Sequence, residues 1–193
     1  AQNAVLAESQ RRLLSHRTPP RDVEVPPYYP DTQAVREEIA RQYDNVQLMD
    51  VWVGERMKEL EQAGLLENTI VIWTTDHGDG LPRAKRSLYD SGLKVPMIIR
   101  FPDGRSAGSV DDGLISFIDL APTLLALAGV DVPSHLKGRN ILDRRLPDQT
   151  YVFAGRDRFD ELYVDRSRAV RSRTFTYIRN DLPDVPFYGD IPF

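Results

Sequence analysis

The feature that most constrains the fold is a continuous run of apolar and β-branched residues, TIVIWTT at positions 69–75. A run without polar alternation predicts a strand that is buried on both faces, as in a parallel sheet covered by helices. The segment KVPMIIRF at 94–101 predicts a second such strand, and residues 114–117 predict a short third one. With helices between them, these strands predict the α/β fold class.

A long helix is predicted ahead of the first strand. Apolar residues recur at steps of three and four from residue 35 to residue 60, which is the period of an amphipathic helix. Asp31 or Thr32 caps its start and Gly64 follows its end, so the helix should span 32–63.

Three further segments complete the expected organisation. The proline-rich residues 18–30 predict an extended connector, with a disordered tail as the alternative. A second helix is predicted over 120–128, with Asp119 as its cap and not as a metal ligand. After about Pro147, short runs of alternating polar and apolar residues predict an antiparallel meander with one solvent-exposed face.

Composition excludes some functions and leaves others open. The 193 residues carry a net charge of −4, which does not indicate binding to nucleic acid. No apolar run approaches the ~18 residues of a membrane span, so no membrane partner is predicted. There is no cysteine, hence no disulfide and no thiolate nucleophile in these residues. The first residues lack both a Met and the apolar core of a signal peptide, so the localisation stays unknown.

Polar residues follow the first strand at the point where sites gather in open α/β sheets. Asp76 offers a carboxylate oxygen and His77 an imidazole nitrogen, and adjacent residues in a turn can reach one divalent ion. Gly78 and Gly80 are expected to let the backbone turn tightly. A basic cluster follows within ten residues, and it would hold an anionic substrate beside the metal: Arg83, Lys85 and Arg86.

Each of these features has an ordinary structural alternative. Asp76 and His77 can form a turn in which the carboxylate accepts bonds from nearby amides. The basic cluster can be a solvated surface loop. The residues alone do not decide between these alternatives and a site.

The combined pattern resembles the sulfatase family of the alkaline phosphatase superfamily. The similar stretches cover roughly residues 25–180 and comprise a buried strand with Asp-His-Gly, then KRSLYD at 85–90, Val95–Pro96, IDLAPTLLALAG at 118–129, and the helix with Asp50 and Gly54. The resemblance implies the C-terminal part of a three-layer α/β/α catalytic domain over 1–148. It also implies a small antiparallel β subdomain over 149–193.

The resemblance assigns roles to individual residues. Asp76 and His77 would ligate the divalent ion, most commonly calcium in this family. Lys85 would contact the sulfate group and act as a catalytic residue by neutralising charge on the sulfuryl oxygens. Calcium prefers oxygen ligands, and the nitrogen of His77 fits zinc or manganese by softness, so the ligand chemistry leaves the metal open.

The tail resembles the sulfamidase (heparan N-sulfatase) branch, which hints at a sulfated amino sugar. In GRDRFDE at 155–161, Arg158, Asp160 and Glu161 are candidates for binding the sugar, with a surface salt-bridge network as the alternative. Arg168 and Arg171 are interpreted as charges on a sheet edge.

One departure from the family is large. Sulfatases carry a Cys- or Ser-x-Pro-x-Arg motif whose first residue becomes the formylglycine nucleophile, and neither form occurs here. Further metal-binding aspartates belong to the same N-terminal region of the family. Two protein ligands do not fill the 6–8 positions that calcium takes. The chain is therefore expected to be a C-terminal fragment that is inactive without an N-terminal portion.

Two other functions remain open. One is a phosphodiesterase or phosphonate hydrolase of the same superfamily, and the other is a non-catalytic, decayed sulfatase-like module. The expected partners are a sulfated small molecule or glycan and the N-terminal portion of the enzyme. A homodimer is left open.

Overall fold

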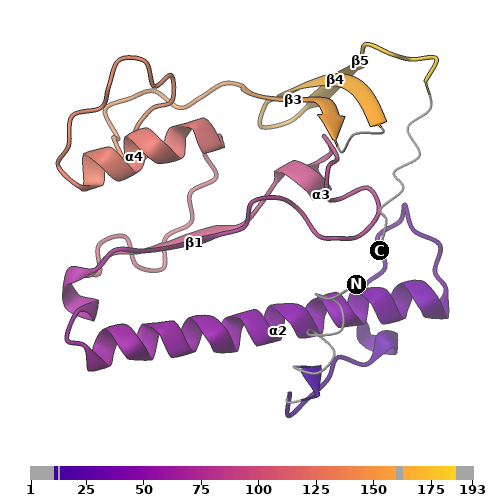
Figure 1. Ribbon diagram of the computed structural model, residues 1–193, viewed down its shortest axis with the longest axis horizontal. Helices are drawn as coiled ribbons and strands as arrows, with labels where there is room; N and C mark the ends of the chain where they lie inside the picture. Colours follow the sequence, from indigo (N-terminus) through magenta and orange to yellow (C-terminus); the bar gives the residue numbers. More distant parts are fainter. Residues whose placement is uncertain (1–10, 13, 160–162, 186–193) are drawn as a thin grey trace. The chain divides into compact units, whose positions relative to one another are not determined.

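The computed structural model describes residues 11, 12, 14–159 and 163–185. They form two compact units: the described residues up to Trp73 with Ile98–Ala107, and Thr74–Met97 with the described residues from Gly108 onward. Helices and strands alternate in the first part of the chain, and three strands follow (Figure 1). None of the helices in this described part is long and apolar enough to cross a bilayer.

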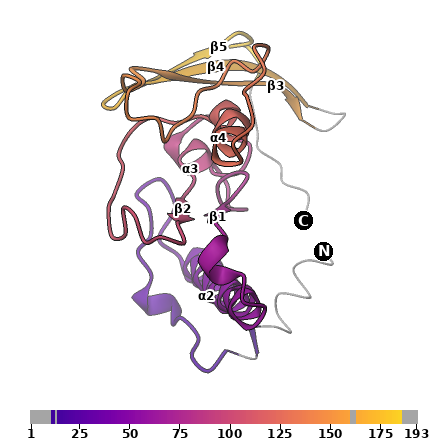
Figure 2. The same cartoon turned by 90° about the vertical axis from the view of Figure 1, so that its left-hand side faces the viewer.

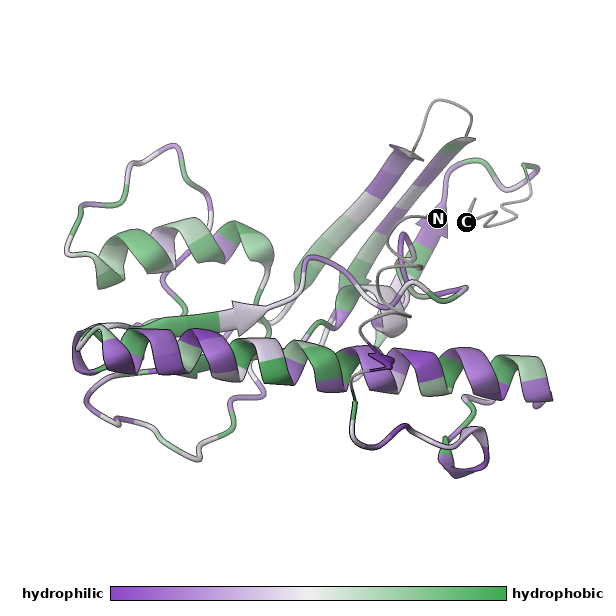
Figure 3. Cartoon of the chain, turned by 60° about the horizontal axis from the view of Figure 1, so that its bottom comes forward, coloured by the Kyte–Doolittle hydropathy of each residue, from purple (hydrophilic) through white to green (hydrophobic). Residues whose placement is uncertain are grey.

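The long helix is confirmed as α2, Gln33–Gln62. The Thr32 hydroxyl caps it by accepting a hydrogen bond from the Val35 amide at 3.3 Å. Gly64 ends it in the left-handed region at φ +68°, and its amide donates to the Glu61 carbonyl oxygen. Figure 3 shows hydrophobic and hydrophilic residues alternating along α2, as expected for an amphipathic helix.

The proline-rich connector packs on α2, so the disordered-tail alternative is wrong for these residues. Arg36 of the helix donates to the carbonyl oxygen of Val23 at 3.2 Å, and Val23 is 4% exposed. The amide of Thr18 donates to the carboxylate of Asp44, a buried helix residue, at 2.8 Å. One short 3₁₀ turn, η1 at Pro20–Asp22, interrupts the connector.

The first two predicted strands form, and each is shorter than predicted. After a 3₁₀ turn, η2 at Leu66–Asn68, β1 spans Val71–Thr74; β2 spans Met97–Arg100, and the two are hydrogen-bonded neighbours. Both strands are half-buried, and Ile98 is 63% exposed. The prediction that they are buried on both faces is therefore wrong for this chain. In the described residues their sheet has two strands, which is too few to bury either face fully.

The predicted third strand does not form. Residues 114–116 are irregular, and Phe117–Asp119 form a 3₁₀ turn, η3. The Ser116 side chain and the Asp119 carboxylate close a reciprocal capping box around this turn. These local hydrogen bonds outweigh the β preference of the apolar run.

The second helix is confirmed as α4, Leu120–Leu127, with Asp119 at its N-cap position as predicted, although not as a side-chain cap. Its side chain makes no cap hydrogen bond to α4. The carboxylate is buried, at 2% exposure, and accepts from the amides of Ser116 and Arg139, both at 2.9 Å, and from the Gln149 amide at 2.8 Å. Asp119 therefore anchors a later loop to the helix.

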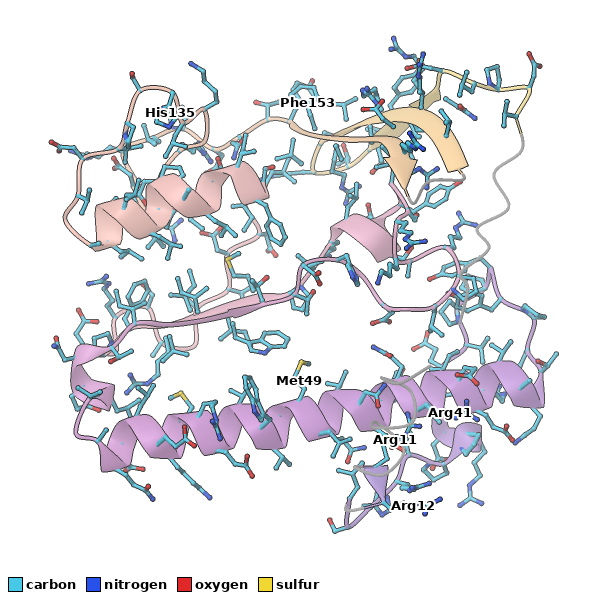
Figure 4. All side chains as sticks on the ribbon, viewed as in Figure 1. Arg11, Arg12, Arg41, Met49, His135 and Phe153 are labelled. Atoms are coloured by element: carbon cyan, nitrogen blue, oxygen red, sulfur yellow. The ribbon has the colours of Figure 1, made fainter. Side chains whose placement is uncertain are left out.

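The antiparallel meander is confirmed as β3 (Val152–Phe159), β4 (Tyr163–Arg171) and β5 (Thr176–Asn180), in that order. Its two faces differ in exposure, as predicted. Phe153 (Figure 4) and Tyr177 are 74% and 64% exposed on one face, whereas Ser167 and Ala169 are buried on the other. Figures 1 and 2 show α3 (Asp90–Leu93) on one side of this sheet. The domain boundary at residue 148 stays a prediction.

Candidate metal and substrate site

The Asp76–His77 turn begins directly after β1. The Thr75 hydroxyl donates to the His77 carbonyl oxygen at 3.0 Å, which closes the turn on itself. The Gly78 amide donates to the Gly92 carbonyl oxygen of α3 at 3.2 Å. The turn therefore has fixed contacts on both sides, and its two side chains project from a defined backbone.

The imidazole of His77 is oriented by the backbone of the residue that follows it. Its Nδ1 lies 2.7 Å from the carbonyl oxygen of Gly78, and because a carbonyl only accepts, Nδ1 carries the proton. The other ring nitrogen, Nε2, then has a free lone pair. It lies 3.6 Å from Oδ2 of Asp76, and the carboxylate is 86% exposed. This tautomer is the one that a metal-binding imidazole needs.

The separation of these two atoms fits a shared divalent ion. Two ligands at about 2.1–2.4 Å from one ion, at roughly 90–110°, lie about 3–3.9 Å apart. The 3.6 Å between Nε2 and Oδ2 falls in this range without any movement. No group of three or more His, Cys, Asp or Glu side chains able to hold a metal occurs among the described residues. Asp76 and His77 would thus supply two of the ligands, and others would complete the site.

The two glycines near the turn have a role that differs from the predicted one. Neither Gly78 nor Gly80 has a left-handed φ, so tight turning is not what requires them. At Gly78 a Cβ would lie 1.9 Å from the carbonyl oxygen of Ser91, so only glycine allows the turn to meet α3. At Gly80 a Cβ would meet nothing within 4 Å.

We expect Gly78→Ala to lower the free energy of unfolding by about 1–3 kcal/mol, because the added methyl group overlaps backbone that has no flexible end to move. Gly80→Ala is the matched control and should change it by less than about 0.5 kcal/mol. Urea unfolding of the 193-residue chain measures both. Equal effects of the two substitutions would contradict the close-approach role of Gly78.

Lys85 lies on a loop that is bonded to the same turn. Its amide donates to the Asp79 carbonyl oxygen at 2.8 Å, and the buried side chains of Ala84 and Leu88 anchor the loop on either side. The half-buried Lys85 side chain makes no hydrogen bond or ion pair with any residue in the described part of the chain. An ammonium group that has no partner among these residues is available to an anionic substrate.

The remaining basic residues of the cluster shape the loop. Arg83 and Arg86 flank Lys85 and adopt left-handed backbone angles, φ 63° and 68°, which are uncommon for residues other than glycine. The guanidinium of Arg83 stacks over the ring of Tyr89 at 4.1 Å. Of the three basic residues, Lys85 is the one whose side chain has no partner among the described residues, and its role as a substrate contact stays a prediction.

The candidate sugar-binding residues are only partly described. Arg158 is exposed on β3, where it pairs with Val164 of β4, next to an irregularity in the strand register. Asp160 and Glu161 lie outside the described residues. A sugar-binding role for the three stays a prediction.

The edge assignment of Arg168 and Arg171 is wrong, because β4 is the central strand of its sheet. Being three positions apart, the two side chains occupy opposite faces. Arg168 pairs with Asp157 at 2.6 Å on the exposed side. Arg171 pairs with Asp90, the first residue of α3, at 3.1 Å.

Sequence reasoning missed a buried pair on the same face as Arg171. Arg156 of β3 and Asp165 of β4 form an ion pair with side chains 16% and 7% exposed, and the Ser167 hydroxyl donates to the Asp165 carboxylate at 2.7 Å. The signal was present in the sequence: Asp165, Ser167 and Ala169 alternate as small or acidic residues along one strand face. Such a face packs closely and must pair its charge.

Asp76, His77 and Lys85 therefore follow β1 within one hydrogen-bonded stretch of chain, and their roles in binding a metal ion and an anionic group stay predictions. The sulfatase family model matches residues 13–130, and the model for the C-terminal region of N-sulphoglucosamine sulphohydrolase matches residues 82–179. The chain belongs to the sulfatase family.

Curated relatives agree with this assignment. An ulvan-active sulfatase of Formosa agariphila is 44% identical over 170 residues, which are 88% of this chain and 28% of the relative. Human N-sulphoglucosamine sulphohydrolase is 32% identical over 186 residues, or 90% of this chain and 37% of the relative. The chain thus spans between 28% and 37% of the length of these two relatives.

Solved structures give the same fold. A 2-O GAG sulfatase matches with a TM-score of 0.61 and 26% identity, over 77% of this chain and 33% of that one. A phosphonate monoester hydrolase from Silicibacter pomeroyi matches with a TM-score of 0.66 over 90% of this chain and 38% of that one. At 23% identity, this second likeness shows the fold alone.

Proposed function

We propose that this chain forms the C-terminal share of a sulfatase active site that hydrolyses a sulfate ester or an N-sulfo group. One observation carries the proposal. An aspartate–histidine pair with metal-ligand spacing lies in a turn to which the loop of an unpaired lysine is hydrogen-bonded. Membership of the sulfatase family supports sulfate over other anions as the group that is transferred.

In this proposal Asp76 and His77 hold a divalent ion, which we take to be calcium, with zinc and manganese as the alternatives left by the nitrogen ligand. The bound ion supplies positive charge for the sulfuryl oxygens. Lys85 contacts the same oxygens through its ammonium group. As the S–O or S–N bond breaks, charge moves onto the leaving atom and the sulfuryl group, and Lys85 is placed to neutralise part of it.

The substrate that we propose is a sulfated glycan. The relatives support it, since one is named for activity on ulvan and another for N-sulphoglucosamine. The candidate residues for binding the sugar are Arg158, Asp160 and Glu161.

The 193 residues alone are proposed to turn over nothing. They contain neither cysteine nor a Ser-x-Pro-x-Arg motif, so no residue here can become the formylglycine nucleophile. Activity then requires a nucleophile-bearing portion and the further metal ligands that accompany it. The competing possibility is a module that binds sulfated glycans without reaction.

A chimera tests the proposal directly. The aligned 170 residues of the Formosa agariphila ulvan-active sulfatase are replaced by the corresponding residues of this chain, and sulfate release from ulvan is measured. We expect turnover within about tenfold of the parent enzyme, because the replaced segment and the segment from this chain are 44% identical.

Loss of turnover in a folded chimera would contradict the proposal and favour the non-catalytic module. A phosphonate monoester assayed in parallel distinguishes the phosphonate hydrolase alternative, which predicts faster reaction of that substrate. The isolated chain serves as the control that should release no sulfate.

A further inference from the structure

Two arginines on one face of the β3–β5 sheet reach the segment that bears Lys85. Arg156 donates through Nη1 to the carbonyl oxygen of Arg86, the residue after Lys85. Arg171 forms an ion pair through Nη2 with the carboxylate of Asp90 at 3.1 Å. The strand register pairs Arg156 with Ser167 and Val152 with Arg171, so both arginines project from the same face. The sheet therefore holds both ends of the segment 86–90.

The guanidinium of Arg156 has two separate partners. Its Nη2 pairs with the buried carboxylate of Asp165, while its Nη1 reaches the Arg86 carbonyl oxygen. The Ser167 hydroxyl occupies the other carboxylate oxygen, which fixes Asp165 in turn. The N–H donors of a planar guanidinium have a fixed geometry relative to one another. When the Asp165 carboxylate orients Nη2, it therefore also orients Nη1, which donates to the loop. A lysine ammonium at this position has no such pair of donors.

The held carbonyl belongs to a backbone that needs support. Arg86 has φ 68°, a left-handed angle that costs about 1 kcal/mol or more for a side chain other than glycine. Such a conformation persists when surrounding contacts fix it. Lys85 is then tied on both sides, by its own amide to Asp79 and by the Arg86 carbonyl to Arg156.

We propose that Arg156 and Arg171, with their acidic partners Asp165 and Asp90, are positioning residues that aim Lys85 at the sulfuryl group; this rests on the role of Lys85 in the proposed function. They act through the loop and do not contact substrate. The antiparallel sheet is thereby a working part of the site and not only an appended subdomain.

Arg156→Lys separates positioning from stability. It keeps a positive charge beside Asp165, so no buried carboxylate is left unpaired, but it removes the second donor to the loop. In the 193-residue chain, the amides of Lys85 and Ser87, bonded to Asp79 and Ala84 at 2.8 and 3.0 Å, should exchange with solvent about tenfold faster. Arg179→Met is the control, because Arg179 pairs with Asp181 on the exposed face.

Turnover by the chimera then distinguishes positioning from a general loss of structure. Arg156→Lys should lower kcat about 10- to 100-fold with KM changed by less than about threefold, since the loss arises in the transition state. In a Lys85→Ala background the same substitution should have no further effect, because the group that it positions is gone. Additive losses would overturn the proposal.

A second variant guards against misfolding. Arg156→Met with Asp165→Asn removes both buried charges together, so the sheet should keep its stability while the loop is released. Its exchange and turnover should match those of Arg156→Lys. Unchanged amide exchange at Lys85 and Ser87 in both variants would overturn the positioning role of Arg156, whether or not the chimera is active. An inactive parent chimera would count against the proposed function alone.

Discussion

Replacing Lys85 by alanine in the chimera should lower kcat about 10²- to 10³-fold, which is the usual loss when one preorganised charge donor is removed from a developing anion. The half-buried Lys85 side chain has no partner among the described residues, so its charge is available to the proposed substrate. Because the Lys85 side chain makes no hydrogen bond or ion pair in that part of the chain, the substitution should leave the unfolding midpoint nearly unchanged. Steady-state sulfate release and urea unfolding measure the two quantities.

Lys94→Ala is the matched control for this prediction. Lys94 is an exposed lysine nine positions further along, at the end of α3, and its removal should leave turnover within about twofold. Turnover at the parental level in the Lys85 variant would refute its role as a substrate contact. A Lys85 variant that is inactive and also unfolds more readily would mean that the side chain is structural.

The second large effect concerns metal. Asp76→Ala in the chimera should abolish stoichiometric metal, because in the proposed site the 3.6 Å pair with His77 supplies two of the protein ligands, and a single remaining imidazole is a poor site for calcium. Elemental analysis after exhaustive dialysis measures calcium, zinc and manganese together, which also identifies the ion. The isolated chain, which contributes two ligands, should bind weakly even as wild type.

Asp112→Ala provides the comparison, since Asp112 is an exposed aspartate of the same unit outside the site. Its metal content should equal that of the parent. Unchanged metal in the Asp76 variant would refute the ligand assignment. His77→Ala should behave like Asp76→Ala if the Nε2 lone pair is used as the tautomer indicates.

Features that depend on residues close together in the chain were predicted correctly. The three-and-four period and the Thr32 cap placed α2 within a residue or two of its observed ends. The uninterrupted apolar run placed β1 and therefore the Asp76–His77 turn at its end. Helical period, capping and strand termini are local properties, so they can be read from the residues themselves.

Predictions failed where a local signal competed with a distant partner. Residues 114–117 have strand propensity, yet the chain is irregular over 114–116 and a capping box closes Phe117–Asp119 into a 3₁₀ turn. The Asp119 carboxylate bonds to Arg139 and Gln149, which are 20 and 30 positions away, and makes no cap hydrogen bond to the helix that follows it. Burial of a carboxylate is stable only where such donors converge, and that convergence is a property of the fold.

The Asp76–His77 turn, the loop of Lys85 and the family were all determined by the sequence, because an apolar strand, an Asp-His-Gly turn and their spacing are contiguous. The tertiary structure decided what holds that site in place. Arg156 lies 70 positions from Arg86, and Gly78 is needed because of the Ser91 carbonyl oxygen across the turn. A side chain in one strand and a carbonyl in a distant loop meet only through packing, and no local pattern encodes that distance.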